Sequence, residues 1–581
     1  MKGETHIQLG CICLTDTADA VSVFLMEVEM KTKQKIVDVV NERSLWEGKG
    51  DIKTYLIVLL ITLIPAYILW YLMIPALNLK SVAFWIYLFL ISFFYLMNLF
   101  FYASIKRKPA SLKVPTLVLV LLISVMVLAG IGGSRIFHAK RYSQILQVED
   151  GEIGLIPSVD KTESIALMDT ASAERLGDRE IGSLSGVVSQ YNVGNYIQIN
   201  KSEMPMKVSP LTYDGFFKWL SNKENGVPGY VIVNPVDMSA DYVSLQEGMK
   251  YVPSAYFSKD LARHIRMAYP NVLFDNLHFE IDEEGNPWYV ASIYDHTIGL
   301  FGGKKVIGAL LINPINGEVS RSEVKDIPQW VDVVFSGDLI CDQYNDHAQL
   351  QHGFINSIFG QRDCRQVTVM PSEDDEETYI PDYGYIAKDG DIWVYTGITS
   401  VNGDSSNIGF ILANERTSET RFITSAGADE FSAMKSAEGE VQEKRYQASF
   451  PSLINVDGTP TYIMVLKDAN NLVKMYAAVN VEQYNLVSTA VSQEECIQKY
   501  RTLIHSELEI DDIADRSDFE EKTITIQKIQ TIDIEGNTWI YVIDTDNQIY
   551  RAKYVDVIDM IMHEAGDTIT ILTDGNMFTM K

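Results

Sequence analysis

Three apolar stretches close to the N-terminus constrain this chain more than any other feature. Residues 55–79, 81–104 and 114–132 contain no charged side chain, and a helix needs about 20 apolar residues to cross a bilayer. A helix buried in a soluble core would be shorter and would carry a polar edge. The sequence therefore predicts that residues 55–132 contact lipid as three transmembrane helices, with Pro65 and Pro75 as kink positions in the first.

Basic residues around these stretches favour one orientation. Seven Lys or Arg precede the first stretch and four lie between the second and third, whereas the connection between the first two contains only Lys80. Cytoplasmic loops are enriched in Lys and Arg, so we expect a cytoplasmic N-terminus and an extracytoplasmic C-terminal portion. Arg135, Lys140 and Arg141 weaken this bias without reversing it. This orientation places four aromatic residues near the outer interface: Trp70, Tyr71, Trp85 and Tyr87.

The first 29 residues have no apolar core of a signal peptide. Glu27-Val28-Glu29 can be encoded as GAG-GTG-GAA, which resembles a ribosome-binding sequence just ahead of Met30. We therefore hypothesise that translation starts at Met30 in a bacterium.

Charge divides sharply along the chain. Of 48 Lys and Arg and 77 Asp and Glu, 12 and 9 lie in residues 1–132, which leaves a balance of −32 for residues 133–581. Binding to nucleic acid depends on neutralising phosphates with Lys and Arg. The large C-terminal portion is therefore not expected to bind nucleic acid.

Two phrases recur along this acidic portion. The first is a β-rich run, an acidic or Asx turn with Gly and a second β-rich run, at residues 280–293, 385–398, 453–466 and 531–544, with Gly285, Gly390, Gly458 and Gly536 in the turns. The second is a strand, a polar turn and another strand, at residues 229–245, 308–324, 409–425 and 474–489. Both predict hairpins, joined into β-meanders and interrupted by helices at 258–269 and 344–360. Their irregular spacing excludes a strict solenoid or propeller.

The strand and turn around Asn316-Gly317-Glu318 resemble the PepSY-type fold, in which a turn similar to D-x-x-T-G-E joins strands packed on a helix. The resemblance covers roughly residues 200–330 and 380–490. It implies a non-catalytic binding or inhibitory module of the cell envelope.

The C-terminal part begins with a predicted helix that Ser492 can cap, with Glu495 in the third position. Short strands follow, and we expect an OB-like or SH3-like small barrel at residues 520–581. The predicted fold class is thus a membrane-anchored α+β protein with three transmembrane helices and a β-rich multidomain ectodomain. The expected domains are a cytoplasmic segment (1–53), the transmembrane helices (54–133), a juxtamembrane β-rich segment (134–200), PepSY-like α+β units (201–370), a second β-meander unit (371–490) and a helix with a small barrel (491–581).

Candidate chemistry is sparse. Residues 341–352 contain a group that suggests metal ligands, namely Cys341, Asp342, Asp346, His347 and His352. Five residues separate the two histidines, so on a helix they diverge by roughly 140°, which argues against a shared metal. The acidic turns 282–286, 371–378 and 544–548 lack the spacing of an EF-hand loop. Residues 299–308 match a phosphate loop only in composition, and no nucleophile elbow occurs. No catalytic, cofactor-binding or metal site is predicted.

Three cysteines lie in the predicted ectodomain, Cys341, Cys364 and Cys496. An odd number leaves at least one unpaired, and in an oxidising compartment Cys341 and Cys364 form the nearest pair in sequence.

These observations favour a non-enzymatic protein of the bacterial cell membrane, whose ectodomain binds a protein or polymer or scaffolds a membrane complex. The alternative is a regulator of an envelope hydrolase or protease, or an envelope enzyme. A channel role would require oligomers, because Asn98 and small hydroxyls are the main polar groups of the spans.

Overall fold

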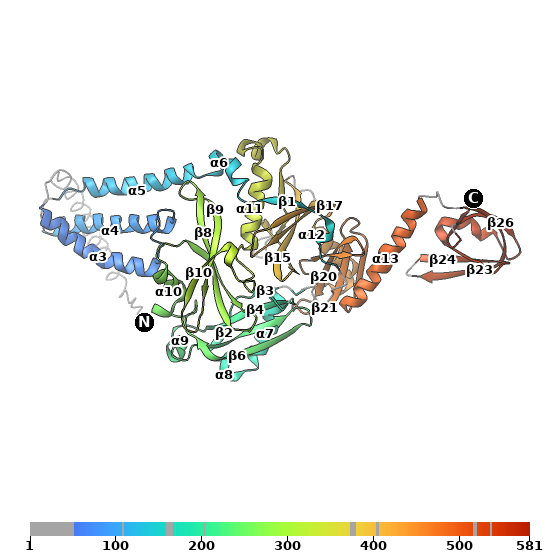
Figure 1. Ribbon diagram of the computed structural model, residues 1–581, viewed down its shortest axis with the longest axis horizontal. Helices are drawn as coiled ribbons and strands as arrows, with labels where there is room; N and C mark the ends of the chain where they lie inside the picture. Colours follow the sequence, from blue (N-terminus) through green and yellow to red (C-terminus); the bar gives the residue numbers. More distant parts are fainter. Residues whose placement is uncertain are drawn as a thin grey trace, which may run out of the picture. The chain divides into compact units, whose positions relative to one another are not determined.

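The computed structural model describes residues 51–106, 110–158, 167–168, 170–202, 204–371, 379–401, 406–514, 520–534, 537–573 and 575–580. The Met30 hypothesis and nearly all of the predicted cytoplasmic segment lie outside these residues. The chain divides into two compact units, with the boundary in the sequence between Cys496 and Ile497. The first unit carries long helices followed by several β-sheets (Figure 1).

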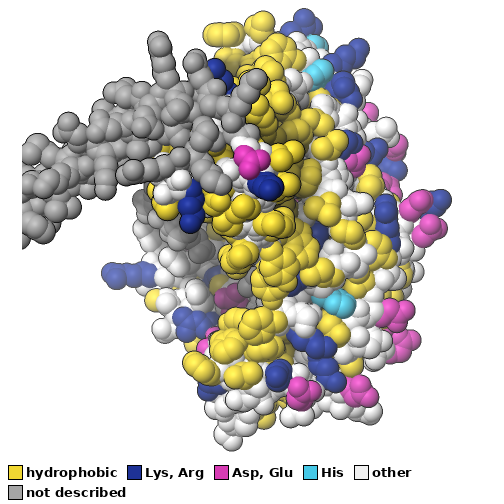
Figure 2. Space-filling view, turned by 90° about the vertical axis from the view of Figure 1, so that its left-hand side faces the viewer, with side chains coloured by type: hydrophobic (Ala, Val, Ile, Leu, Met, Phe, Trp, Pro, Cys, Tyr) yellow, Lys and Arg dark blue, Asp and Glu magenta, His cyan; other side chains and the backbone are white. Residues whose placement is uncertain are grey.

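In the described residues, three helices are long and apolar enough to cross a membrane: α3 (Ile52–Met73), α4 (Val82–Lys106) and α5 (Lys113–Gly132). This confirms the three predicted apolar helices and makes the chain a candidate multi-pass membrane protein. Pro65 lies inside α3. Pro75 does not, because the helix ends at Met73 and Ile74 takes a left-handed conformation, so the prediction of a kink at Pro75 was wrong. Figure 2 shows hydrophobic side chains forming a broad band on the face that carries these helices.

The β-rich part of the first unit contains four antiparallel meanders of four consecutive strands. Meander 1 comprises β3 (Ile197–Lys201), β4 (Met204–Tyr213), β5 (Val227–Asn234) and β6 (Ser239–Met249). Meander 2 comprises β7 (Phe274–Ile281), β8 (Pro287–Ile298), β9 (Gly302–Ile312) and β10 (Val319–Glu323). Meander 3 comprises β14 (Gly384–Lys388), β15 (Asp391–Ser400), β16 (Ser406–Asn414) and β17 (Thr420–Ala428). Meander 4 comprises β19 (Ser452–Val456), β20 (Thr459–Lys467), β21 (Val473–Asn480) and β22 (Val487–Ala490).

A helix precedes each meander in the chain. These helices are α7 (Thr170–Gly182), α10 (Leu261–Ala268), α11 (Gly337–Leu350) and α12 (Glu430–Glu440). Helix α10 agrees with the prediction at 258–269. The single helix predicted at 344–360 is divided between the end of α11 and the π-helix η5 (Asn356–Gly360). Ser336 caps α11 by accepting from Leu339 N, and Gly353 with its φ of +90° follows the end of that helix. Helix α11 therefore starts earlier than predicted, and a break at Gly353 separates it from η5.

The two recurring phrases are hairpins, as predicted. The first phrase gives the pairs β7–β8, β14–β15, β19–β20 and β23–β24. The second gives β5–β6, β9–β10, β16–β17 and β21–β22. In the first group Gly285, Gly390 and Gly458 have positive φ, which glycine adopts without steric cost. Gly536 lies outside the described residues.

The second group of hairpins shares one turn. In each, an Asn at the end of the third strand accepts hydrogen bonds through Oδ1 from the backbone N–H groups two and three residues later. These residues are Asn234, Asn313, Asn414 and Asn480. Such Asx turns satisfy backbone donors at a reversal of direction. The same local solution therefore recurs in all four meanders.

The meanders share their cores in chain order. One cluster joins residues of meanders 1 and 2, a second joins meanders 2 and 3, and a third joins meanders 3 and 4. Along β16, Phe410 and Leu412 lie in the third cluster, while Ile411 and Ala413 lie in the second. Successive side chains of a strand point to opposite faces. Meanders 2 and 3 are therefore buried on both faces, which explains their nearly continuous apolar strands.

Shorter elements complete the first unit. Helix α6 (Arg135–Tyr142) follows α5, and β1 (Val148–Gly151) pairs in parallel with β17. Helix α9 (Phe216–Asn222) and the 3-10 helix η3 (Phe257–Lys259) flank β5 and β6. The short strands are β2 (Tyr191–Val193), β11 (Arg365–Val367), β12 (Val369–Pro371), β13 (Tyr379–Pro381) and β18 (Gln447–Ala448).

The last part of the chain contains helix α13 (Gln493–Ala514), where Ser492 Oγ accepts from Glu495 N at 3.3 Å as the predicted cap. The second unit then holds β23 (Glu520–Ile534), β24 (Asn537–Asp544), β25 (Ile549–Lys553), β26 (Thr568–Thr573) and β27 (Phe578–Met580). Their sheet has the order β25-β24-β23-β26-β27. Its two outer strands approach each other at one isolated bridge, between Arg551 and Met577. A barrel closed by continuous ladders is thus not formed by the described strands.

The shared turn predicts a graded loss of stability. We expect Asn313→Ala to cost about 1 kcal/mol, because two backbone donors at a part-exposed turn lose their acceptor. Asn414 is buried and also donates to Asp391 at 2.7 Å, so we expect Asn414→Ala to cost about 2–3 kcal/mol. Pulse proteolysis in urea on the detergent-solubilised protein measures both, and equal losses would contradict this reading.

Candidate functional site

The α3–α4 connection contacts meander 2. Leu77 N donates to Pro270 O at 2.8 Å, and Asn78 Nδ2 donates to Asn271 O at 3.0 Å. The Lys80 ammonium lies 2.7 Å from Asp295 Oδ2 and also donates to His296 O. The connection between α3 and α4 and the β-rich part therefore lie at the same end of the helices.

Two arginines of α10 bind the C-terminal end of α3. Arg263 donates to Tyr71 O at 3.3 Å, with its guanidinium 4.1 Å from the centre of the Tyr71 ring. Arg266 is buried and donates to Ile74 O at 3.2 Å and to Val272 O. Burial lowers the pKa of Arg266 to about 10. The carbonyl groups at a helix C-terminus carry partial negative charge, so they stabilise these two cations.

A third attachment follows α5. A Cβ added at Gly302 would lie 2.2 Å from Gly133 O, so only glycine permits this close approach. Tyr142 donates to Gly133 O at 2.6 Å and accepts from Gly303 N at 3.1 Å. Arg135 forms two hydrogen bonds with Asp346 on α11, of 2.6 and 3.0 Å. Gly299 and Gly302 of the 299–308 segment thus serve packing against the end of α5.

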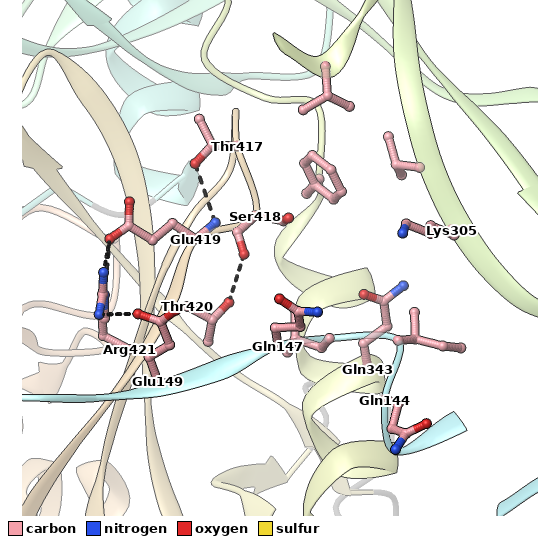
Figure 3. Close-up of a pocket in the computed structure, with 15 residues that line it drawn as sticks. Gln144, Gln147, Glu149, Lys305, Gln343, Thr417, Ser418, Glu419, Thr420 and Arg421 are labelled. Atoms are coloured by element: carbon pink, nitrogen blue, oxygen red, sulfur yellow. Dashed lines mark hydrogen bonds and ion pairs between the residues drawn. The ribbon is translucent and has the colours of Figure 1, made fainter. Parts of the chain in front are cut away.

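A polar cavity of about 660 Å³ lies between meanders 2 and 3. We call residues 143–147, between α6 and β1, the linker. Figure 3 shows Thr417–Arg421 and Glu149 on one side of the cavity, and Gln144 and Gln147 of the linker, Gln343 of α11 and Lys305 of β9 on the other. The apolar part of the lining consists of Ile145, Leu146, Val306, Val324 and Phe335. The polar part consists of Gln144, Gln147, Glu149, Lys305, Gln343, Thr417, Ser418, Glu419, Thr420 and Arg421. Its volume is typical of sites that hold small ligands or short polymer segments.

The charged groups of the cavity differ in whether they form ion pairs. Arg421 forms ion pairs with Glu419 at 2.8 Å and with Glu149 at 2.5 Å. Lys305 is exposed and forms no ion pair with a described residue. Gln343 donates to Lys304 O at 2.9 Å, whereas Gln144 and Gln147 are exposed. The cavity thus offers amides that can both donate and accept, with one cation available to an anionic group.

Buried carboxylates position the segment that supplies Phe335. Glu280 accepts from Asp332 N at 2.9 Å and Val333 N at 3.0 Å, and Asp332 accepts from Asn200 N at 2.7 Å. The backbone carbonyl of Glu415 accepts from Val334 N and Phe335 N. The segment is therefore bound to meanders 1, 2 and 3.

Burial also alters the acidity of these groups. Burial and the neighbouring Glu280 raise the pKa of Asp332 well above its ordinary value, and burial does the same for Glu415. Glu430, the first residue of α12, accepts from Gly397 N at 2.6 Å, and burial raises its pKa to about 7. These carboxyl groups hold protons at a pH where exposed carboxyl groups are ionised.

The structure separates the residues of the suggested metal group. Cys341 is buried in the core between meanders 2 and 3, and Asp346 binds Arg135. His347 contacts Ser143 O at 3.0 Å, whereas His352 lies 3.0 Å from Asp363. In the described part of the chain no three His, Cys, Asp or Glu residues are arranged to hold a metal ion. Cys341 and Cys364 are free thiols, so the Cys341–Cys364 disulfide is not formed.

The other candidates have structural roles. Asp282 accepts from Asn286 N at 2.8 Å and from the Trp288 indole at 3.1 Å, so this acidic turn is closed internally. Asp544 likewise accepts from Asp546 N and Gln548 N. Residues 372–378 lie outside the described residues. The sequence contained no signal for the cavity, because its lining comes from distant segments whose amides and hydroxyls follow no spacing rule.

Comparisons with known proteins assign no family. No protein-family model matches the chain, and no curated protein matches it. Solved structures similar to it include a B. megaterium levansucrase variant, at 9% identity with a TM-score of 0.17, covering 77% of this chain and 94% of that one. Another is Bacillus subtilis levansucrase, at 8% identity with a TM-score of 0.16, covering 74% and 96%. Neither similarity carries an argument about fold or function.

The pKa of Glu430 predicts a pH-dependent stability. Because the folded pKa lies above the ordinary value of 4.5, this group stabilises the fold fully below about pH 4.5 and loses that contribution as the pH rises through 7. The loss is on the order of 3 kcal/mol. Glu430→Gln keeps an acceptor for Gly397 N and cannot ionise, so stability should fall less between pH 5 and 8. Urea unfolding at several pH values measures this, and an unchanged slope would refute it.

Proposed function

We propose that this chain is a membrane-anchored binding protein, whose β-rich ectodomain receives an extended polypeptide segment of a partner in the cavity between meanders 2 and 3. The observation that carries the proposal is the lining of that cavity, where glutamine amides and small hydroxyls surround an apolar floor. Peptide groups need both donors and acceptors, and glutamine side chains supply both.

The charge of Lys305 adds a preference for an acidic segment. Lys305 is the one charged group of the cavity without an ion-pair partner in the described residues. It favours a segment that carries an Asp, a Glu or a C-terminal carboxylate. The remaining surface is strongly acidic, so it disfavours partners of high negative charge elsewhere.

The membrane orientation is part of the proposal. The α3–α4 connection contacts meander 2, so the end of α4 at Lys106 and the start of α5 at Lys113, which flank Arg107 and Lys108 in the sequence, belong to the opposite end of the helices. The positive-inside bias then favours a cytoplasmic α4–α5 loop and an extracytoplasmic ectodomain. The proposed location is the cell membrane of a bacterium.

We propose a non-catalytic role. The polar lining of the cavity contains amides, hydroxyls and Lys305, and its two carboxylates, Glu149 and Glu419, both form ion pairs with Arg421. None of the described lining residues is a His or Cys. The helix-plus-meander repeat supports the resemblance to PepSY-type domains, which implies binding or inhibition. A regulator of an envelope hydrolase or protease is one form of this function.

Photo-crosslinking tests the proposed binding site. A photoreactive amino acid in place of Gln147, in the full chain in its native membrane, should form discrete adducts with a polypeptide. Glu284 is an exposed residue of the β7–β8 turn that does not line the cavity, and it serves as the control position. Lys305→Glu should reduce the adducts at least several-fold, because it reverses the free charge. Equal adducts at both positions, or adducts unaffected by Lys305→Glu, would overturn the proposal.

Protease access tests the orientation. A C-terminal tag should be digested by added protease in cells whose wall has been removed, while a cytoplasmic protein in the same cells stays intact. If the tag is protected until the membrane is broken, the proposed orientation is wrong, and the ectodomain must meet cytoplasmic partners.

A further inference from the structure

Exposed apolar side chains gather beside the end of α3 that faces meander 2. Phe217 of α9 is 78% exposed and Phe257 of η3 is 54% exposed, values unusual for aromatic residues of a soluble surface. Leu220 and Met267 are also exposed. Beneath them Phe216 contacts both Tyr256 and Trp219, with ring centres 5.1 and 5.7 Å apart. We call Phe216, Phe217, Trp219, Tyr256 and Phe257 the aromatic foot.

One guanidinium connects the aromatic foot to the first membrane helix. Arg263 donates to Phe257 O at 2.7 Å through Nη1 and to Tyr71 O at 3.3 Å through Nη2. Tyr71 belongs to the last turn of α3. The Arg263 side chain alone therefore joins the backbone of the foot to the end of a predicted span. This places the foot at the level of the membrane interface.

The foot has a firm support. Trp219 is buried at its base and contacts Phe257, with ring centres 5.7 Å apart. Asp260 caps α10 by accepting from Arg263 N at 2.8 Å. In Figure 2, the lower part of the face that carries the membrane helices shows hydrophobic side chains beside Lys and Arg. Lys218 and Lys259 belong to the same two short helices as the exposed rings.

We propose that the aromatic foot inserts into the interfacial layer of the membrane, in the leaflet on the ectodomain side. Aromatic rings with nearby cations suit this layer, where apolar bodies meet acyl chains and cations meet phosphate groups. The foot is continuous with the lipid-facing end of α3, so a lipid surface reaches it without any other protein. The ectodomain then lies on the bilayer at a point outside the helices.

The inference rests on the membrane placement of the three helices and is independent of the cavity. It predicts a lateral contact with lipid at a fixed point of meander 1, which hydropathy alone does not identify, because α9 and η3 are too short to span a membrane.

Lipid photo-crosslinking tests this contact. The full chain is placed in nanodiscs of phosphatidylethanolamine and phosphatidylglycerol that carry a diazirine on the acyl chain, and adducts are mapped by mass spectrometry. We expect adducts on the peptides of α9 and η3 as well as on α3, α4 and α5. Tyr484, in the turn between β21 and β22, is also 54% exposed, and its peptide is the matched control that should remain unlabelled.

The variants Phe217→Ser and Phe257→Ser should reduce labelling of α9 and η3 several-fold, while Tyr484→Ser leaves it unchanged. Phe217 is so exposed that its replacement removes little packing, which separates loss of lipid contact from unfolding. Labelled membrane helices with unlabelled α9 and η3 would overturn this inference alone. Unlabelled helices would overturn the membrane placement itself.

Discussion

The architecture depends on the way a membrane helix ends against a soluble β-meander. Arg266 is buried and has no carboxylate partner among the described residues. Backbone carbonyls bind it, one of them that of Ile74, the residue directly after α3. A buried cation is tolerated only where such groups replace its water. Together with Arg263, Lys80 and the close contact of Gly133 with Gly302, it attaches the ends of α3 and α5 to meander 2. The β-rich part is therefore held at several points, which a flexible tether would not provide.

The stacking of the meanders determines what surfaces remain for function. Meanders 2 and 3 lose both faces to neighbouring cores, so any site between them has to lie where their edges diverge. The cavity occupies such a place, closed on one side by the linker that follows α6. The buried carboxyl groups of Glu280 and Asp332 fix the segment that carries Phe335, which means that the apolar floor is already formed before anything binds.

Sequence patterns predicted much of this fold because each depends on neighbours in the chain. The membrane helices follow from uncharged length, and the hairpins follow from Gly and Asx turns such as those of Gly390 and Asn313. The start of α11 was missed because Ser336 stands in an apolar run that masks its capping role. The cavity, the aromatic foot and the buried acids could not be predicted, since each assembles residues from distant segments. Arg263 illustrates this, because its two carbonyl partners belong to Tyr71 of α3 and Phe257 of η3, which lie far apart in the sequence.

The position of the cavity also determines how far from the membrane helices a bound segment would lie. Gln144 and Gln147 belong to the linker that leaves α6, and α6 begins directly after α5. Arg135 and Tyr142 of α6 bind Asp346 and Gly133 at the start of the linker. At its other end β1 pairs with β17, so the linker is held at both ends. Under the proposed function, a partner bound in the cavity would stay close to the bilayer, and this confinement would raise its effective concentration toward other membrane proteins. The proposed binding function would benefit from an ectodomain that is firmly attached to the helices, because an ectodomain on a hinge would spread the bound partner over a larger volume.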